Sequence, residues 1–347
     1  MNVLIDCTNL KVRGGIQVAT SFINDLKVLD LKINFIAVLS REMEGNFSNV
    51  DIAKNIKIIN LPEKIRSKGK ISKFLRQIEK DYLINRVFCV FGPSYYKSSV
   101  KKIVGYALPH FIYSESPFFK LISLKSKIRL FHPEKIQIYL FKKNSDELIF
   151  ETEDAKNRFN DKYSFKKTCH VVSNTLNEVF LNQAKWEFYE LSSNSDLKIL
   201  CLSANYPHKN LNIIPRVIDH LIQLGLSNFK FYISVEKHAL GFPEKYSSYI
   251  DFIGKVPLNR IPSLFSQVDI VFMPTLLEVF STTFLEAMYM EKPLVVADMS
   301  FSRDVCYDAA LYYEPTNEMD AAQKIFQIAK DDDLRENLIA NGEIKLK

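Results

Sequence analysis

The sequence predicts an α/β protein built from two doubly wound domains. Short apolar runs alternate with stretches of helical period, a succession typical of buried parallel strands connected by helices. This succession stops at the polar stretch 192–196 and then starts again. The length of 347 residues also fits two domains. Because hydrophobic residues make up 47% of the chain and charged residues 25%, the composition excludes a disordered or low-complexity protein.

The strands can be located from the apolar runs, taken in chain order. In the first domain, residues 1–180, they are expected at Val3–Ile5, Phe35–Leu39, Ile56–Ile59, Val87–Phe91, Ile103–Tyr106, Leu148–Phe150 and His170–Val172. In the second domain, residues 181–347, they are expected at Lys198–Leu202, Lys230–Ile233, Ile250–Ile253, Ile270–Met273, Pro293–Val296 and Ala310–Tyr312. Ligands of open parallel sheets bind beyond the carboxyl ends of the strands, so the segments that follow these runs are the places to search for chemistry.

The net charge of +6 is unevenly distributed along the chain. Residues 51–150 hold 20 Lys/Arg and 8 Asp/Glu, a net charge of +12, so the remaining residues sum to −6. Within this block, residues 64–80 place basic and apolar side chains at helical spacing. The pattern fits a solvated helix face, and it also fits a surface in residues 64–102 that meets an anionic membrane or a polyanionic acceptor. No nucleic-acid-binding motif accompanies the charge, so nucleic acid is not an expected partner.

Cysteine usage and the N-terminal residues predict a cytoplasmic protein. The five cysteines lie far apart, without the spacing of zinc ligands, as expected for reduced thiols. Residues 1–6 lack the basic and apolar regions of a signal peptide, and no run approaches 18 apolar residues. Any membrane association is therefore expected to be peripheral, on the inner face of the cytoplasmic membrane.

A glycine pair follows the first predicted strand. Gly14 and Gly15 precede a helix expected to begin near Ile16, and glycines there let backbone N–H groups approach an anionic or sugar ligand. The pair also fits an ordinary turn. It does not form the G-x-G-x-x-G pattern, which argues against a nicotinamide enzyme.

The most specific pattern of the chain is the stretch 274–288, PTLLEVFSTTFLEAM. A strand ending at Met273 leads into a loop, and a helix is expected to start near Ser281 or Thr282. Free N–H groups at that helix start would suit a phosphate. Glu278 before the helix and Glu286 inside it could accept hydrogen bonds from hydroxyls on either side of the phosphate. A diphosphate flanked by two polyols is a nucleotide sugar.

A lysine follows the first strand of the second domain. In LSANYPHKNL, residues 202–211, Lys209 precedes a helix expected from about Leu211. A lysine at that place can meet a pyrophosphate as a point charge. An isolated lysine would more simply be a solvated surface residue, but this one lies at the same predicted sheet edge as the glutamate pair.

Together these residues resemble a known family. Glu278 and Glu286 in EVFSTTFLEAM look like the paired glutamates of retaining GT-B glycosyltransferases, family 4 (glycosyl transferases group 1), of the type that builds polysaccharides and O-antigens. The resemblance extends to the Gly14–Gly15 pair, to Lys209 and to Phe252–Val256, the strand and loop that usually hold the nucleobase. It implies a GT-B fold, in which two Rossmann-like domains face each other across a cleft, with the acceptor on the first and the nucleotide sugar on the second.

The resemblance also implies roles for single residues. Glu278 would bind the donor sugar, Lys209 would neutralise the departing diphosphate, and His110 matches a first-domain histidine that reaches the donor sugar. The other expected donor-binding residues are Gly14, Gly15, Asn205, Gly254, Val256, Phe280, Ser281, Thr282, Thr283 and Glu286. The leaving phosphate itself would help to deprotonate the acceptor. No metal site and no cofactor are expected, because Lys209 and a helix N-terminus would stabilise the negative charge that develops on the diphosphate.

The sequence departs from the family pattern at two positions. Many members carry an arginine five residues before the phosphate-binding lysine, where this chain has Ala204; Arg216, Arg260 or a first-domain residue could compensate. The family's E-x-F-G is E-V-F-S here, so Ser281 would need a backbone conformation that glycine adopts more easily.

These patterns lead to an expected reaction and leave alternatives open. We expect transfer of a sugar from a nucleoside-diphosphate sugar, with retention, to a glycan acceptor such as a polyprenyl-diphosphate-linked chain in O-antigen or capsule assembly. A catalytically silent relative that binds nucleotide sugar or glycan as a scaffold is the alternative, and a nucleotide-sugar epimerase is a third hypothesis. The sequence specifies neither base, sugar nor linkage.

Overall fold

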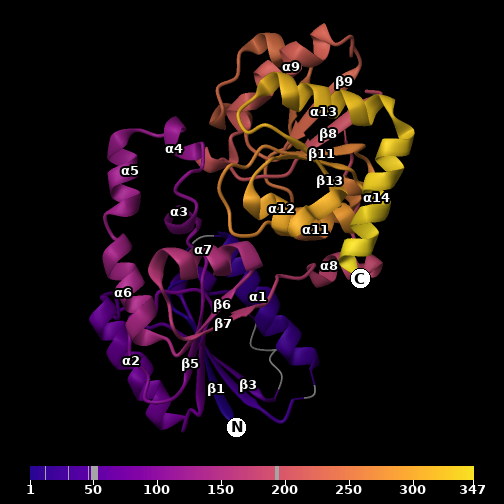
Figure 1. Cartoon of the computed structure of the whole chain (residues 1–347). Helices are drawn as coiled ribbons and strands as arrows, with labels where there is room; N and C mark the ends of the chain where they lie inside the picture. The colour runs from indigo at the N-terminus through magenta and orange to yellow at the C-terminus, as the bar shows by residue number, and fades with distance from the viewer. Residues whose placement is uncertain (12, 30, 46, 48–53, 192–194) are drawn as a thin grey trace. The chain divides into compact units, whose positions relative to one another are not determined.

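The computed structural model describes residues 1–11, 13–29, 31–45, 47, 54–191 and 195–347. Most of the polar stretch 192–196 lies outside the described residues. The chain divides into two compact units (Figure 1). Unit 1 comprises Met1–Ile112 and Ile128–Asn174, and unit 2 comprises Tyr113–Lys127 and Thr175–Lys347.

Unit 1 contains a parallel sheet of seven strands in the order β3-β2-β1-β4-β5-β6-β7. The strands are β1 Asn2–Cys7, β2 Asn34–Leu39, β3 Ile56–Asn60, β4 Arg86–Cys89, β5 Lys102–Gly105, β6 Glu147–Phe150 and β7 Thr168–Val171. Its helices are α1 Arg13–Val28, α2 Lys68–Asp81, α3 Pro109–Ile112, α6 Glu134–Asn144 and α7 Glu153–Tyr163, with a 3₁₀ turn η1 at Arg41–Met43. Each strand predicted for the first domain is present within one or two residues of its expected position.

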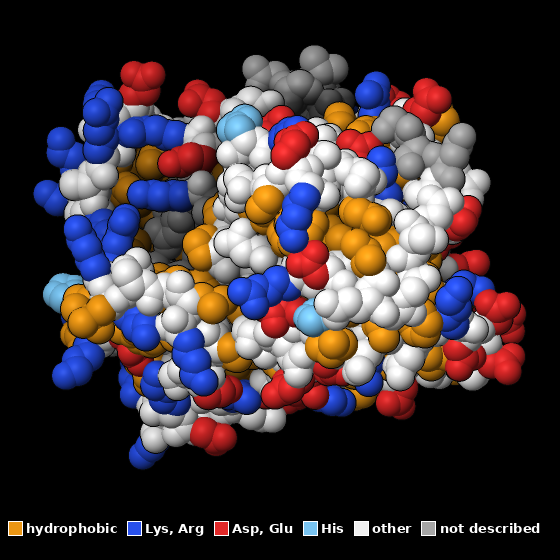
Figure 2. Space-filling view, turned by 90° about the horizontal axis from the view of Figure 1, so that it is seen from above, with side chains coloured by type: hydrophobic (Ala, Val, Ile, Leu, Met, Phe, Trp, Pro, Cys, Tyr) orange, Lys and Arg blue, Asp and Glu red, His pale blue; other side chains and the backbone are white. Residues whose placement is uncertain are grey.

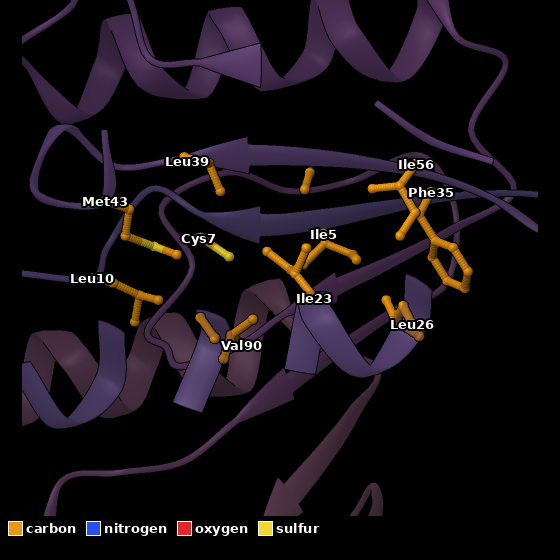
Figure 3. Packing of buried hydrophobic residues seen from close by; sticks show 12 residues of the cluster. Ile5, Cys7, Leu10, Ile23, Leu26, Phe35, Leu39, Met43, Ile56 and Val90 are labelled. Atoms are coloured by element: carbon orange, nitrogen blue, oxygen red, sulfur yellow. The ribbon is translucent and has the colours of Figure 1, made fainter. Parts of the chain in front are cut away.

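Continuous apolar runs form these strands because helices cover both faces of the sheet. On one face, Ile5, Cys7 and Leu39 pack against Ile23 and neighbouring side chains of α1, as Figure 3 shows. On the other face, Leu4, Ile36 and Val38 pack against the apolar side of α2 and its flanking residues. The two clusters bury most of β1 and β2 from both sides, while the edge strand β3 is only partly covered.

Unit 2 contains a parallel sheet of six strands in the order β10-β9-β8-β11-β12-β13. The strands are β8 Leu197–Cys201, β9 Phe229–Ile233, β10 Ile250–Phe252, β11 Ile270–Met273, β12 Leu294–Ala297 and β13 Ala310–Tyr313. The helices are α4 Phe118–Leu121, α8 Glu178–Leu181, α9 Ile214–Gln223, α10 Ile261–Ser266, α11 Thr282–Tyr289, α12 Ser300–Cys306, α13 Glu318–Lys330 and α14 Asp332–Leu346. Figure 1 shows α9 and α13 on one face of this sheet and α11 and α12 on the other. The second set of predicted strands is thus confirmed.

Short 3₁₀ turns connect several elements of unit 2. They are η2 Gln183–Lys185, η3 Pro207–Lys209, η4 Leu211–Ile213, η5 Lys237–Ala239, η6 Glu244–Tyr246, η7 Leu258–Arg260 and η8 Tyr307–Ala309. The acidic run at 331–333 begins α14, where the Asp331 carboxylate accepts a hydrogen bond from the Leu334 N–H at 2.9 Å. The run is therefore the N-terminal cap and first turn of this helix.

Each sheet has one point at which the chain reverses its direction of strand addition. In unit 1 this switch point lies between β1 and β4, and in unit 2 it lies between β8 and β11. Loops diverge there at the carboxyl edge, and ligands of doubly wound sheets bind in the crevice that results.

One segment leaves the first set of elements and packs with the second. We call Tyr113–Lys127 the crossing segment; it follows α3, contains α4 and ends inside α5, which spans Leu124–Phe131. Nothing in its local sequence distinguishes it from the rest of the first predicted domain. Among the described residues, no helix combines the length and apolar character that crossing a membrane requires.

Candidate donor-binding site

The loops after β8 and β11 meet at the switch point of unit 2. The Leu276 N–H donates a hydrogen bond to the His208 carbonyl at 2.8 Å and ties the two loops together. Beside this tie, the Lys209 ammonium forms an ion pair with the Glu278 carboxylate. Both side chains are largely buried, with 14% and 16% of their surface exposed. The structure therefore brings together the two residues to which the sequence assigns phosphate and sugar binding.

Two buried polar atoms beside this ion pair lack hydrogen-bond partners within the described part of the chain. Glu278 uses Oε1 for Lys209, while its Oε2 is buried and unsatisfied. The side-chain amide nitrogen of Asn210 is also buried without a hydrogen-bond partner among the described residues. The backbone of Asn210 adopts a left-handed conformation with φ 52°. A buried polar atom without a partner typically costs 1–3 kcal/mol. An acceptor and a donor without partners, next to a lysine, suit a polyol bearing a phosphate.

The N-terminus of α11 is open to an anion. Ser281 is its N-cap residue, and its side chain makes no capping hydrogen bond to the first turn. The first turn, which contains Thr282 and Thr283, holds no acidic residue that would compete for the N–H groups. Phe280 precedes the cap and is partly buried. The structure contradicts the expectation that Ser281 needs a glycine-like backbone, because its φ of −123° and ψ of 116° are ordinary extended values.

Glu286 is buried inside the same helix. Burial raises the pKa of its carboxyl to about 7, although hydrogen bonds from Thr283 and Thr282 favour the ionised form. Those two residues lie three and four positions earlier, so all three side chains share one helix face. Glu286 is thus a carboxyl group that can both donate and accept near neutral pH, a suitable partner for the hydroxyl pair of a ribose.

The two arginines of unit 2 that the sequence offers as substitutes for the missing family arginine are paired elsewhere or exposed. His208 is partly buried and stacks on Tyr206, with ring centroids 5.5 Å apart. Burial, and secondarily the charge of Lys209, lowers the pKa of His208 to about 4, so the imidazole is neutral at pH 7. Arg260 pairs with Glu187 at 3.1 Å. Arg216 is exposed on α9. Lys209 and the N–H groups at the start of α11 are thus the groups of unit 2 that we consider for a phosphate.

The remaining unit 2 residues expected to bind the donor differ in how they are engaged. Asn205 donates its side-chain amide to the Ala239 carbonyl at 2.8 Å, so it also holds its loop in place. Gly254 follows β10 with φ +62°, and a Cβ there would lie 2.8 Å from Oε1 of Glu236. Val256 is buried two residues later. The loop after β10 is thus shaped by a glycine that no other residue replaces without strain.

In unit 1 the structure corrects the predicted glycine loop. Helix α1 begins at Arg13, so Gly14 and Gly15 lie in its first turn and not in a loop before Ile16. Gly15 permits close packing, because a Cβ there would lie 3.3 Å from Leu10 and 3.4 Å from the Phe91 ring. Gly14 is exposed, with open space around its Cα. The expected glycine loop is therefore absent among the described residues. The glycine pair still lies at the N-terminus of a helix, a position that suits an anion.

His110 lies in α3, directly after β5, where the sequence places it. Burial is the main cause that lowers the pKa of His110 to about 4. The smaller effects of the nearby charges partly cancel, because Glu134 raises this pKa and Lys162 lowers it. The next residue is fixed by α7, since Lys162 and Tyr163 both donate to the Phe111 carbonyl, at 2.6 and 3.1 Å. His110 is therefore a neutral imidazole on a well-anchored turn.

The crossing segment contributes contacts that the sequence did not predict. Ser116 is buried and donates its hydroxyl to the Leu276 carbonyl at 2.6 Å. Two residues later, the Phe118 ring meets the His208 ring edge-on, with centroids 6.0 Å apart. The segment thus supports both loops that carry Lys209 and Glu278. These partners lie 160 and 90 residues apart in sequence, so no local pattern could have revealed them.

Within the described ranges, no three His, Cys, Asp or Glu side chains gather as a potential metal site. The glutamates of the site are engaged otherwise: Glu278 with Lys209, and Glu286 with two threonine hydroxyls. The positive groups at the site are an ammonium and backbone N–H groups.

Comparisons with known proteins agree with this geometry. Residues 182–345 match the model of the family Glycosyl transferases group 1. The chain is 23% identical over 214 residues to the uncharacterized glycosyltransferase MJ1178 of Methanocaldococcus jannaschii, covering 59% of this chain and 56% of the relative. It is 23% identical over 164 residues to the O-antigen chain mannosyltransferase RfbU of Salmonella typhimurium, covering 45% of each. The chain thus spans about half the length of the curated relatives it matches.

A solved structure supports the fold over nearly the whole chain. Anabaena Alr3699/HepE in complex with UDP-glucose superposes with a TM-score of 0.66 at 14% sequence identity, covering 99% of this chain and 94% of that one. Such a similarity concerns the fold, and together with the two switch-point sheets it shows that the chain has the GT-B architecture. Lys209, Glu278 and Glu286 all lie within residues 182–345, the part of the chain that matches the glycosyl transferases group 1 model.

Proposed function

We propose that this protein is a retaining glycosyltransferase that moves a sugar from a nucleoside-diphosphate sugar to a glycan acceptor. One observation carries the proposal: the buried, unsatisfied Oε2 of Glu278, beside an oxygen already paired with Lys209. Oε2 of Glu278 can accept a hydrogen bond from a sugar hydroxyl. Two protons of the Lys209 ammonium remain available for a phosphate. The uncapped start of α11 adds N–H groups for the same diphosphate.

The proposed reaction replaces one bond to the anomeric carbon with another on the same face. The bond from the anomeric carbon to the diphosphate oxygen breaks, the bond to the acceptor oxygen forms, and the acceptor proton passes to the leaving diphosphate. Lys209 and the α11 N–H groups stabilise the negative charge that develops there. The mechanism proposed here uses no metal ion and no other cofactor, since these groups neutralise the leaving group. His110, neutral at pH 7, would hydrogen-bond the donor sugar.

The acceptor we propose is a growing glycan, carried on a polyprenyl diphosphate at the cytoplasmic face of the membrane, in O-antigen or capsule assembly. Support comes from the similarity to a protein described as an O-antigen chain mannosyltransferase. The net charge of +12 in residues 51–150 adds attraction toward a diphosphate or an anionic bilayer. The bound sugar and base are for the first experiment to identify.

That experiment screens UDP-, GDP-, ADP- and dTDP-sugars for binding by thermal shift and for release of nucleoside diphosphate. With the donor found, Lys209→Ala should lower kcat by about 10²–10³-fold, the range for losing one group that stabilises developing charge. Glu278→Gln should weaken donor binding. The matched control is the exposed pair of the same unit, Lys185 and Glu178, 2.6 Å apart, whose Lys185→Ala and Glu178→Gln variants should be unaffected.

Four results would each be decisive against a part of the proposal. Equal activity of Lys209→Ala and the wild type would remove the assigned role of the ion pair. Isomerised nucleotide sugar without an acceptor would indicate an epimerase. A protein that binds one donor tightly, yet releases no nucleoside diphosphate with any glycan acceptor, would instead be a scaffold of the glycosyltransferase type. Inversion at the anomeric carbon, read from the product by NMR, would refute retention alone.

A further inference from the structure

Helix α5 exposes apolar side chains without burying any residue. Leu124 and Ile128 are 71% and 59% exposed, and no residue of this eight-residue helix is buried. They lie one turn apart and share a face. Leu121, just before the helix, is 53% exposed. A helix this short gains little stability in water by itself, so an amphipathic one with an uncovered apolar side indicates a surface that covers it elsewhere.

The charge around this apolar face has one sign. Between Glu115 and Glu134 the chain has no acidic residue, and it has four basic ones: Lys120, Lys125, Lys127 and Arg129. In the helix, Lys127 lies to one side of the Leu124–Ile128 stripe and Lys125 to the other. Figure 2 shows Lys and Arg side chains along its left margin, the side on which the basic helices α2, α5 and α6 lie in Figure 1.

Helix α2, the basic segment singled out by the sequence, is built differently. Its apolar residues Leu75 and Ile78 are buried in the core of unit 1, so its lysines form the solvated outer face of a packed helix. Lys102, at the end of the 64–102 range, is only 1% exposed and contacts Ser94 and Tyr96. Ile71 and Phe74 of α2 are partly buried against the same core, so the outer face of the helix itself is mainly charged, although Leu83 just after it is exposed.

We propose that α5 docks the protein onto an anionic lipid bilayer, with Leu124 and Ile128 entering the headgroup region and Lys125, Lys127 and Arg129 contacting lipid phosphates. An amphipathic helix with apolar residues flanked by lysines is the arrangement that lies in a membrane interface. The charge argues against a second copy as the partner, because two α5 helices would bring like charges together. This proposal rests on the proposed function for its biological meaning, but binding of α5 to a membrane does not require sugar transfer.

This assignment also connects lipid contact with the donor site through the chain itself. The crossing segment leads from Ser116, which holds the Leu276 carbonyl, through α4 into α5 within eight residues. Phe118 in α4 contacts the His208 ring. A docked α5 would therefore hold, in unit 2, the same segment that supports the Lys209 and Glu278 loops.

The test measures binding of the full chain to vesicles of phosphatidylcholine with and without phosphatidylglycerol, by co-sedimentation. Wild-type protein should bind the anionic vesicles and lose binding as salt rises. Each basic residue at such a surface contributes about fivefold in partitioning, so Lys125→Gln/Lys127→Gln/Arg129→Gln should weaken binding by roughly a hundredfold. Leu124→Ser/Ile128→Ser should weaken it by about tenfold or more, since two apolar side chains leave the interface.

The matched control removes three charges from α2, as Lys70→Gln/Lys73→Gln/Arg76→Gln, and should change binding far less than the α5 triple variant. A Leu124→Trp variant should also show a blue-shifted emission on anionic vesicles. Equal losses in the α2 and α5 variants, or equal binding to neutral vesicles, would overturn the proposal. So would a self-association, seen by analytical ultracentrifugation, that Leu124→Ser abolishes. Nucleoside diphosphate release with a water-soluble acceptor should survive every α5 change, so failed docking and failed turnover remain distinguishable.

Discussion

Glu286 makes the stability of unit 2 depend on pH in a predictable way. Its pKa is about 7 in the folded chain and 4.5 as the reference value, because burial penalises the charged carboxylate. Between these values the folded state holds a proton that the unfolded state has lost, so stability falls as pH rises. A shift of one pKa unit corresponds to about 1.4 kcal/mol, and from pH 5 to pH 8 this group should therefore remove about 2.5 kcal/mol.

The variant Glu286→Gln should lack this dependence. Relative to the wild type, its free energy of unfolding should rise by about 2.5 kcal/mol between pH 5 and pH 8. Urea unfolding followed by fluorescence of Trp186, the single tryptophan, reports on unit 2. Glu343→Gln, an exposed site on α14, is the control and should parallel the wild type at both pH values. A difference between Glu286→Gln and wild type that stays constant with pH would show that the buried carboxyl ionises normally, and the reasoning would be wrong.

Three further predictions test other parts of the structure. Ser116→Ala leaves the buried Leu276 carbonyl without its 2.6 Å hydrogen bond, so urea unfolding should show a loss of about 1–3 kcal/mol, together with a raised KM for the donor. Gly254→Ala forces alanine to φ +62° and against Glu236, and should destabilise by about 1–2 kcal/mol; adding Glu236→Ala should relieve the contact but not the backbone strain. The His110 imidazole should remain neutral in NMR spectra down to about pH 5, because its pKa is about 4, and signals typical of imidazolium at pH 6 would contradict its burial.

The strands were predictable because their signal is local. A strand buried on both faces is a continuous apolar run, such as Ile270–Met273, and all thirteen runs became strands. The start of α11 was predictable for the same reason, since Ser281 and Thr282 follow a loop and precede an apolar helical pattern. Glycine identity alone was less informative, because Gly14 and Gly15 are compatible both with a loop and with a helix start. The close approach of Gly15 to Phe91 is a long-range contact that the local sequence does not reveal.

Long-range partners and exposure could not be predicted. The Ser116–Leu276 hydrogen bond joins residues 160 positions apart, and a serine before Pro117 looks like any loop residue. Similarly, α2 and α5 both combine lysines with apolar residues at helical spacing. Only the packed structure shows that Leu75 is covered and Leu124 is not, because the difference depends on what lies opposite each helix.

Three unfavourable features of unit 2 lie on the loops after β8 and β11 and on the helix α11 that follows, and together they argue for a ligand there. A carboxylate oxygen of Glu278 and an amide nitrogen of Asn210 are buried without partners in the described structure, and Glu286 is a buried acid with a raised pKa. Each lowers stability, and none is needed to pack the sheet, whose strands are apolar. Costs of this kind persist where function requires them. A donor that supplies hydroxyls to Glu278 and an acceptor to Asn210 would offset them, so the site should be stabilised by its substrate more than by inorganic diphosphate alone.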